Sequence, residues 1–188
     1  MSLFTSSPEG PLAMARLRRV SAVARIFCLA AAALMAFGTF WLCRDPEQLA
    51  AYARGTIGVS ALPGSLSERG YWLALAIGFV PAGLFAAAML RLASLFGRFG
   101  RGLVLEEENA RRLVRVGWLL TAMGVATPLA RALQSVALTF DNPSGQKQLA
   151  LTLDPGMFGA LAAGAALVAF GLVLKEAVRL ADENQSFV

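Results

Sequence analysis

Histidine is absent from the 188 residues of this chain, and cysteine occurs only at Cys28 and Cys43. Without histidine, the chain lacks the usual axial ligands of haem, histidine-based metal sites and catalytic pairs of histidine with serine or cysteine. Both cysteines fall on one predicted helix, about 22 Å apart along its axis, whereas a disulfide needs Cα atoms within about 7 Å. The sequence therefore predicts no disulfide between them, no cofactor and no metal site.

Charged side chains are also scarce. They make up 15% of the chain and hydrophobic residues 57%, whereas soluble domains carry about 25% and 45–50%. The predicted fold class is an all-α integral membrane protein, with an N-terminal tail at 1–19 and a single domain of four transmembrane helices at 20–188. The predicted helices are 20–43, 71–95, 106–138 and 155–181, joined by outer loops at 44–70 and 139–154 and an inner loop at 96–105.

The charges that are present are unevenly distributed. Twelve of the 17 Lys and Arg residues and seven of the 12 Asp and Glu residues lie towards the N-tail, the stretch 91–115 and the C-tail, whereas the other side holds five of each. Since cytoplasmic loops carry the excess of Lys and Arg, we expect a multi-pass inner-membrane protein with both termini in the cytoplasm. The first span should remain uncleaved, because no small-residue cleavage site follows it.

The two outer loops contain short stretches of alternating polar and apolar residues. The pattern is partial at 56–62 and clearer at 148–153, which reads QLALTL. Alternation of this kind is typical of short strands. The pattern allows the two loops to pair in a small extracytoplasmic β-element over the helices.

One charge, Arg131, interrupts the apolar part of the third span near its outer end. Snorkelling, or an ion pair with Asp141 or Asp154, is the expected arrangement, and an anion or substrate pathway is the alternative. The fourth span has a different feature, a stripe of small residues spaced by four that allows close helix packing. These helix-packing positions are Gly156, Ala160 and Gly164.

Three adjacent carboxylates, Glu106, Glu107 and Glu108, precede the third span. Neighbouring positions on a helix point in different directions, so the three cannot chelate one ion. Acids in a first turn complement the helix dipole, and Glu107 and Glu108 lie four residues before Arg111 and Arg112. We expect helix-start stabilisation here, and the sequence predicts no catalytic residue and no enzyme.

The stretches 96–120 (FGRFGRGLVLEEENARRLVRVGWLL) and 167–188 (LVAFGLVLKEAVRLADENQSFV), together with four apolar spans, resemble a bacterial membrane family called domain of unknown function 2975. Its members carry Phe and Gly before a helix that starts with an acidic residue and Asn, and a second acidic residue with Asn in the tail. The matching positions are Phe99, Gly102, Glu108, Asn109, Arg112, Leu113 and Gly117, then Glu176, Leu180, Glu183 and Asn184. Leu105 departs from the Ser or Thr cap usual in the family.

The resemblance implies a bacterial inner-membrane protein with no established enzymatic activity. It also implies a partner, a small Cro/repressor-type helix-turn-helix regulator that the membrane protein holds or releases. The leading hypothesis is a non-enzymatic regulatory or scaffold protein that binds a cytoplasmic partner through 96–113 and 175–188, without binding nucleic acid directly. The candidate partner-binding residues are Phe99, Gly102, Glu108, Asn109, Arg112, Leu113, Glu183 and Asn184. A small transporter or channel, and an accessory subunit of a larger membrane complex or a homo-oligomer, are the alternatives.

Overall fold

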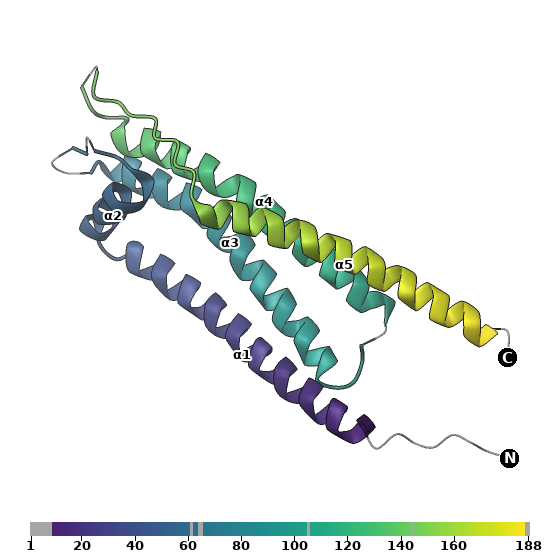
Figure 1. The fold of residues 1–188 in the computed structure, drawn as a ribbon. Helices are drawn as coiled ribbons and strands as arrows, with labels where there is room; N and C mark the ends of the chain where they lie inside the picture. The colour runs from purple at the N-terminus through teal and green to yellow at the C-terminus, as the bar shows by residue number, and fades with distance from the viewer. Residues whose placement is uncertain (1–8, 61, 64–65, 105, 144, 187–188) are drawn as a thin grey trace, which may run out of the picture.

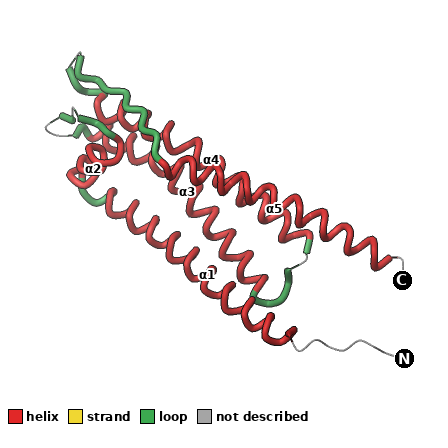
Figure 2. The backbone as a smooth tube through the Cα atoms, in the orientation of Figure 1, coloured by secondary structure: helices red, strands yellow, loops and turns green. Residues whose placement is uncertain are grey.

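The structure, a computed structural model, describes residues 9–60, 62–63, 66–104, 106–143 and 145–186 (Figure 1). Its elements are α1 (Glu9–Leu42), α2 (Pro46–Tyr52), the short π-helix η1 (Ala53–Ile57), α3 (Glu68–Phe99), α4 (Glu107–Thr139) and α5 (Pro155–Ser186). The other described residues lie in turns and loops, as Figure 2 shows. The predicted all-α class is confirmed.

Four stretches are long and apolar enough to cross a membrane: Met14–Leu42, Glu68–Phe99, Glu107–Thr139 and Pro155–Ala181. A hydrocarbon core of about 30 Å needs only about 20 helical residues. Large apolar side chains such as Phe27 and Phe170 remain exposed on the outer faces of these helices. Such a surface would drive aggregation in water, but it matches a hydrocarbon environment. The chain is therefore a multi-pass membrane protein.

The helices run further than the predicted spans. Helix α1 begins at Glu9 and not at residue 20, because residues 11–19 are mostly Leu, Ala, Met and Arg, which favour helix. Helix α3 begins where the Ser67 hydroxyl accepts a hydrogen bond from the Gly70 amide at 3.1 Å. Helix α5 continues to Ser186, past the predicted end at 181. Only the short turn 100–106 separates α3 from α4.

The four spanning helices pack in the order α1, α3, α4, α5, each against the next, so that α1 and α5 form the two edges. Glycine allows the closest approach, between α4 and α5: a Cβ at Gly117 would lie 2.7 Å from the carbonyl oxygen of Gly164. Of the predicted packing positions, Gly164 lies on this seam, Ala160 is half-buried and Gly156 is exposed. The seam continues through Gly171, which the predicted stripe did not include.

A cap covers one end of the helices. It consists of α2, η1 and the residues that follow, and its side chains Leu49, Ile57 and Val59 are almost inaccessible against α3 and α4. Asp45 caps the start of α2, because its carboxylate accepts a hydrogen bond from the Glu47 amide at 2.9 Å. This end of the molecule, with α2, η1 and the loop between α4 and α5, is named here the cap end.

The predicted β-element is wrong, because neither stretch forms a strand where the structure describes it. Polar and apolar residues do alternate at 148–153, but the apolar side chains face outward. The exposed fraction is 72% for Leu149, 64% for Leu151 and 58% for Leu153. The two loops contact each other through side-chain hydrogen bonds in place of the backbone hydrogen bonds of paired strands. The Thr152 hydroxyl donates to the Ile57 carbonyl at 2.7 Å, and the Gln148 amide donates to the Ser60 hydroxyl at 2.8 Å.

Candidate functional site

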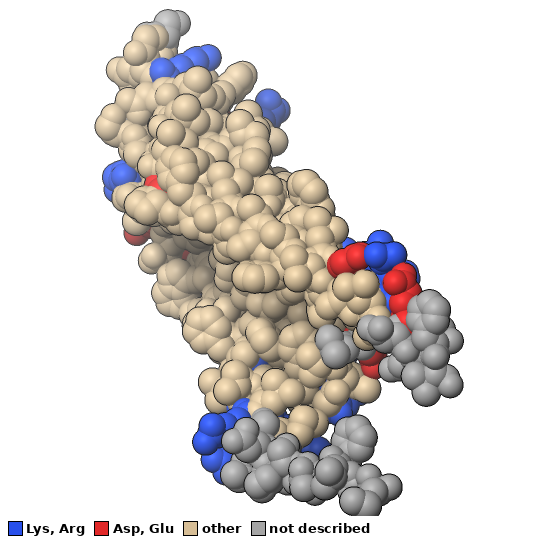
Figure 3. All heavy atoms as spheres, turned by 45° about the vertical axis from the view of Figure 1, so that its right-hand side comes forward, with Lys and Arg blue, Asp and Glu red and all other residues tan. Residues whose placement is uncertain are grey.

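The start of α1, the turn 100–106 and the end of α5 lie together at the end of the molecule opposite the cap, named here the turn end (Figure 1). Figure 3 shows charged side chains towards the two ends of the face in view and an uncharged body between them. All residues that the sequence nominated for partner binding belong to the turn end. The candidate site is therefore built from the turn and the helix ends beside it.

Asn109 is the residue that fixes the shape of the turn. It lies in the first turn of α4 and is fully buried, with 0% of its surface exposed. Its side-chain amide donates to the carbonyls of Leu103 and Val104, at 2.7 and 3.1 Å. Its side-chain oxygen accepts a hydrogen bond from Nε of Arg98 at 2.7 Å. Because one side chain satisfies two turn carbonyls and orients an arginine, Asn109 holds the turn against α4.

The same arginine also pairs across the turn with Glu106, the residue before the first turn of α4. Glu106 occupies the cap position but makes no capping hydrogen bond of its own. The departure from the family at Leu105 lies outside the described residues. The ion pair between Arg98 and Glu106 therefore joins the two ends of the turn directly.

Backbone geometry explains the glycine of the motif. Gly102 has a φ of 85°, in the left-handed region where a side chain is strained. A Cβ there would also lie 3.2 Å from Cε of Met14 on α1. The half-buried Phe99 packs edge-on against Phe96, with ring centroids 6.2 Å apart. These residues shape the turn and bring α1 close to it.

The three acids at the start of α4 point in different directions, as their spacing predicts. Glu107 pairs with Arg111, and Glu108 pairs with Arg112, both at 2.9 Å, so the two predicted i,i+4 pairs are confirmed. No group of three or more metal-ligating side chains gathers in the described part of the chain. The half-buried Leu113 follows on the same helix.

Helix α5 extends the turn end. Val178 is buried, while the charged side chains around it are exposed. Arg179 bridges Glu176 and Glu183 along the helix, at 2.5 and 3.0 Å. The side chain of Asn184 lies outside the described residues. Lys175 lies within electrostatic reach of Glu107 on α4, so the tail and the start of α4 form one charged surface.

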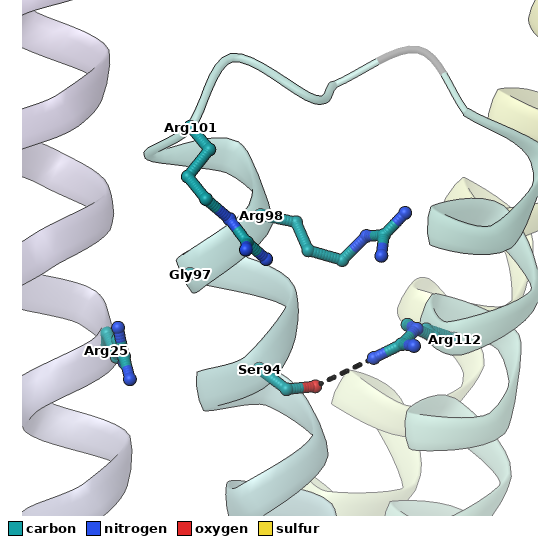
Figure 4. Close-up of a pocket in the computed structure, with 6 residues that line it drawn as sticks. All are labelled: Arg25, Ser94, Gly97, Arg98, Arg101 and Arg112. Atoms are coloured by element: carbon teal, nitrogen blue, oxygen red, sulfur yellow. Dashed lines mark hydrogen bonds between the residues drawn. The ribbon is translucent and has the colours of Figure 1, made fainter.

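A cavity of about 430 Å³ opens beside the turn and is lined mainly by arginine (Figure 4). Its lining residues are Arg25, Ser94, Gly97, Arg98, Arg101 and Arg112. The sequence prediction included Arg112 but did not include Arg25. The signal that could have found it is an arginine in an apolar run with no acid within four residues on either side.

At the cap end, Arg131 pairs with Asp154, one of the two acids proposed for it. Asp154 lies just before α5 and also accepts a hydrogen bond from the Met157 amide at 3.0 Å. The hydrogen bond from Arg131, followed by the one from Met157, lowers the pKa of Asp154 below its ordinary value. Arg131 thus ties the outer part of α4 to the start of α5.

Comparison with the curated proteins found no match, and comparison with the solved structures found none either. A family model described as "Protein of unknown function (DUF2975)" matches residues 65–188. This match covers α3, α4 and α5, and it contains the whole turn with Asn109. The buried asparagine, the turn glycine and the α4–α5 seam give the resembling motif a structural basis. The chain belongs to the DUF2975 family of proteins of unknown function.

Proposed function

We propose that this protein is a non-enzymatic regulatory or scaffold protein of the bacterial inner membrane, with both termini in the cytoplasm. In this proposal the turn end faces the cytoplasm, because the excess of Lys and Arg lies there. Its partner is a soluble cytoplasmic protein that contacts 96–113 and 175–188. By family resemblance, a Cro/repressor-type helix-turn-helix regulator is the first candidate.

The observation that carries the proposal is the ordered turn between α3 and α4, which the contacts of Asn109 hold in shape. From Pro155, about 20 residues of α5 suffice to cross the hydrocarbon core, yet the helix continues to Ser186. Its last residues therefore project beside the turn that Asn109 holds. A surface fixed before binding loses little conformational entropy when a partner docks.

Within this proposal, two of the nominated residues shape the surface, and exposed residues near the nominated positions contact the partner. Asn109 is buried, and Gly102 allows the backbone conformation of the turn, so both residues hold the surface in shape. The side chains available to a partner are outward ones: Leu103 of the turn is 39% exposed, and Glu107 and Arg111 at the start of α4 are exposed too. Apolar side chains accompanied by charged ones at the rim are a common arrangement for a protein contact.

The test uses the full chain in mild detergent and a matched pair of double variants. Leu103→Asp/Arg111→Glu alters the turn end, and Leu149→Asp/Arg54→Glu makes the same changes at exposed positions of the cap end. Soluble proteins retained by the wild-type chain are identified by mass spectrometry, and the candidate is then purified and titrated. We expect affinity to fall at least about tenfold for the turn-end variant only. Equal capture by both variants, or no retained protein, contradicts the proposal.

A second candidate function is an accessory subunit of a larger membrane complex. The observation that favours it is the open order of the helices, which leaves α1 and α5 as edges that do not pack on one another. Exposed side chains such as Phe37 and Phe170 on these edges could meet a foreign helix as well as lipid. Sizing in mild detergent at the mass of a single chain would count against this candidate. The transporter or channel alternative stays a prediction, to be tested by solute flux into proteoliposomes.

A further inference from the structure

We propose that the arginine-lined cavity at the turn end binds a phosphate group, carried either by a lipid headgroup or by a free phosphate compound. The cavity lies between the middle of α1, the end of α3 and the start of α4 (Figure 4). Each of these helices contributes at least one guanidinium: Arg25 from α1, Arg98 from α3 and Arg112 from α4. Arg101 adds a fourth from the turn.

The charges around the cavity do not balance within the chain. Arg98 is paired with Glu106, and Arg112 with Glu108. For Arg25 and Arg101, the described residues provide no carboxylate within ion-pair distance. Within the described part of the chain, two guanidinium groups therefore line the cavity without a carboxylate partner. A doubly basic cavity of this kind attracts an anion.

The position of Arg25 makes this imbalance significant. It lies within the apolar stretch Met14–Leu42, where an uncompensated charge is costly. Its guanidinium lies over Gly97 of α3, 3.6–3.8 Å from the point where a Cβ would stand. Contacts nearer the start of α1 hold the helix there, since Ser21 packs against Gly100 and Met14 against Gly102. An anion that enters from the headgroup level would supply the missing counter-charge.

The donors present are well suited to phosphate. Guanidinium groups offer parallel N–H bonds that match two phosphate oxygens. Arg112 is held in place by Ser94, whose hydroxyl accepts from Nη1 at 3.2 Å and donates to the Arg91 carbonyl at 2.7 Å (Figure 4). A volume of about 430 Å³ exceeds that of a bare ion and falls in the range of small-molecule sites, about 300–1,000 Å³.

The experiment compares two double variants of the full chain, purified without lipid in a neutral detergent. Arg25→Gln/Arg101→Gln removes the two unpaired charges of the cavity. Arg19→Gln/Arg115→Gln removes two exposed charges at the same end that do not line it. Native mass spectrometry measures retention of phosphatidylglycerol against a neutral diacylglycerol, and calorimetry measures binding of inorganic phosphate and glycerol 3-phosphate. Since Arg25 and Arg101 have no described ion pair, the cavity variant should fold, which thermal unfolding checks.

We expect the cavity variant to lose about 30-fold in affinity for a phosphate probe, since each arginine contributes about 1 kcal/mol at an anionic surface. The control variant should lose less than about threefold. Retention of phosphatidylglycerol alone assigns the site to a lipid headgroup, and binding of the soluble probes assigns it to a free phosphate compound. Equal losses in both variants would reduce the effect to general surface charge and overturn the site. Absence of binding by every phosphate probe would overturn it as well. Neither measurement involves a protein partner, so the outcome is independent of the function proposed above.

Discussion

Replacing Asn109 with alanine should release the turn between α3 and α4 while leaving the membrane helices in place. The substitution deprives the carbonyls of Leu103 and Val104 of their donor and Arg98 of an acceptor. The side chain is fully buried, so bulk solvent does not reach these groups until the turn opens. The first effect is therefore local opening of the turn.

The magnitude follows from the three hydrogen bonds. Two bonds to neutral carbonyls contribute about 0.5–1.5 kcal/mol each, and a bond from a charged guanidinium contributes about 1.5–3 kcal/mol. Part of this loss is recovered, because the opened turn reaches water. We expect the turn to be destabilised by about 2–4 kcal/mol, which corresponds to a rise of about 30- to 1,000-fold in the open population.

Limited trypsin digestion measures this opening, because Arg101 lies in the turn and is exposed. Where opening and closing are fast, the rate of cleavage follows the open population. The control is Glu107→Ala, which removes an exposed ion pair two residues away and should cost no more than about 1 kcal/mol. If Asn109→Ala is cut at Arg101 no faster than Glu107→Ala, the asparagine does not hold the turn and the reasoning is refuted.

Three further predictions concern the seam, the cap and the acid at the start of α5. Gly117→Ala should destabilise the protein by about 1–3 kcal/mol in thermal unfolding, because its methyl group would lie 2.7 Å from a backbone oxygen of α5, whereas Gly159→Ala, with open space around it, should not. Leu49→Ala should cost about 2–5 kcal/mol, because the side chain is 1% exposed in the cap core; a loss below 1 kcal/mol would mean that the cap is loosely packed. The pKa of Asp154 is lowered in the folded protein, so the charged carboxylate stabilises the fold fully at pH values above its ordinary pKa of 3.8. This stabilisation is lost as the pH falls through the lower pKa of the folded state. The difference in melting temperature between wild type and Asp154→Asn should accordingly be large near neutral pH and shrink in strong acid; a difference that does not change with pH would contradict the assignment.

The spanning helices could be predicted well from the sequence because a long apolar run indicates a membrane span without any knowledge of tertiary contacts. A stretch such as 71–95 has to be helical in lipid, where every backbone polar group needs an internal partner. The ends of the helices were predicted less well. Residues 11–19 are helical because of intrinsic propensity and contacts such as Met14 with Gly102, and neither shows in a hydropathy pattern.

The β-element failed for a different reason. Alternation at 148–153 indicates two faces, but it does not indicate which face points inward. In water the leucines would turn towards a core, whereas here they point outward and the polar side chains bind the cap. A segment beside a membrane can expose Leu149 at little cost, so the usual assignment of faces does not hold there.

Within the candidate site, the sequence located the turn but could not separate supporting residues from available ones. Asn109 and Glu107 are both polar and lie two positions apart on one helix, which turns them in different directions. Only the fold shows that Asn109 is buried while Glu107 is exposed. The partner-binding role of this end stays a prediction, and its test now uses residues that leave the turn intact.

Arg25 and Arg131 both lie within spanning helices, and their surroundings differ in a way that separates the two ends of the molecule. Arg131 has a carboxylate partner, Asp154, whose position at the start of α5 brings it within reach. Arg25 has Gly97 beneath it and further arginines around it. A guanidinium in a membrane needs a counter-charge wherever it stands. Asp154 supplies that charge at the cap end, whereas at the turn end the proposed phosphate group would supply it, at the level where lipid phosphates lie.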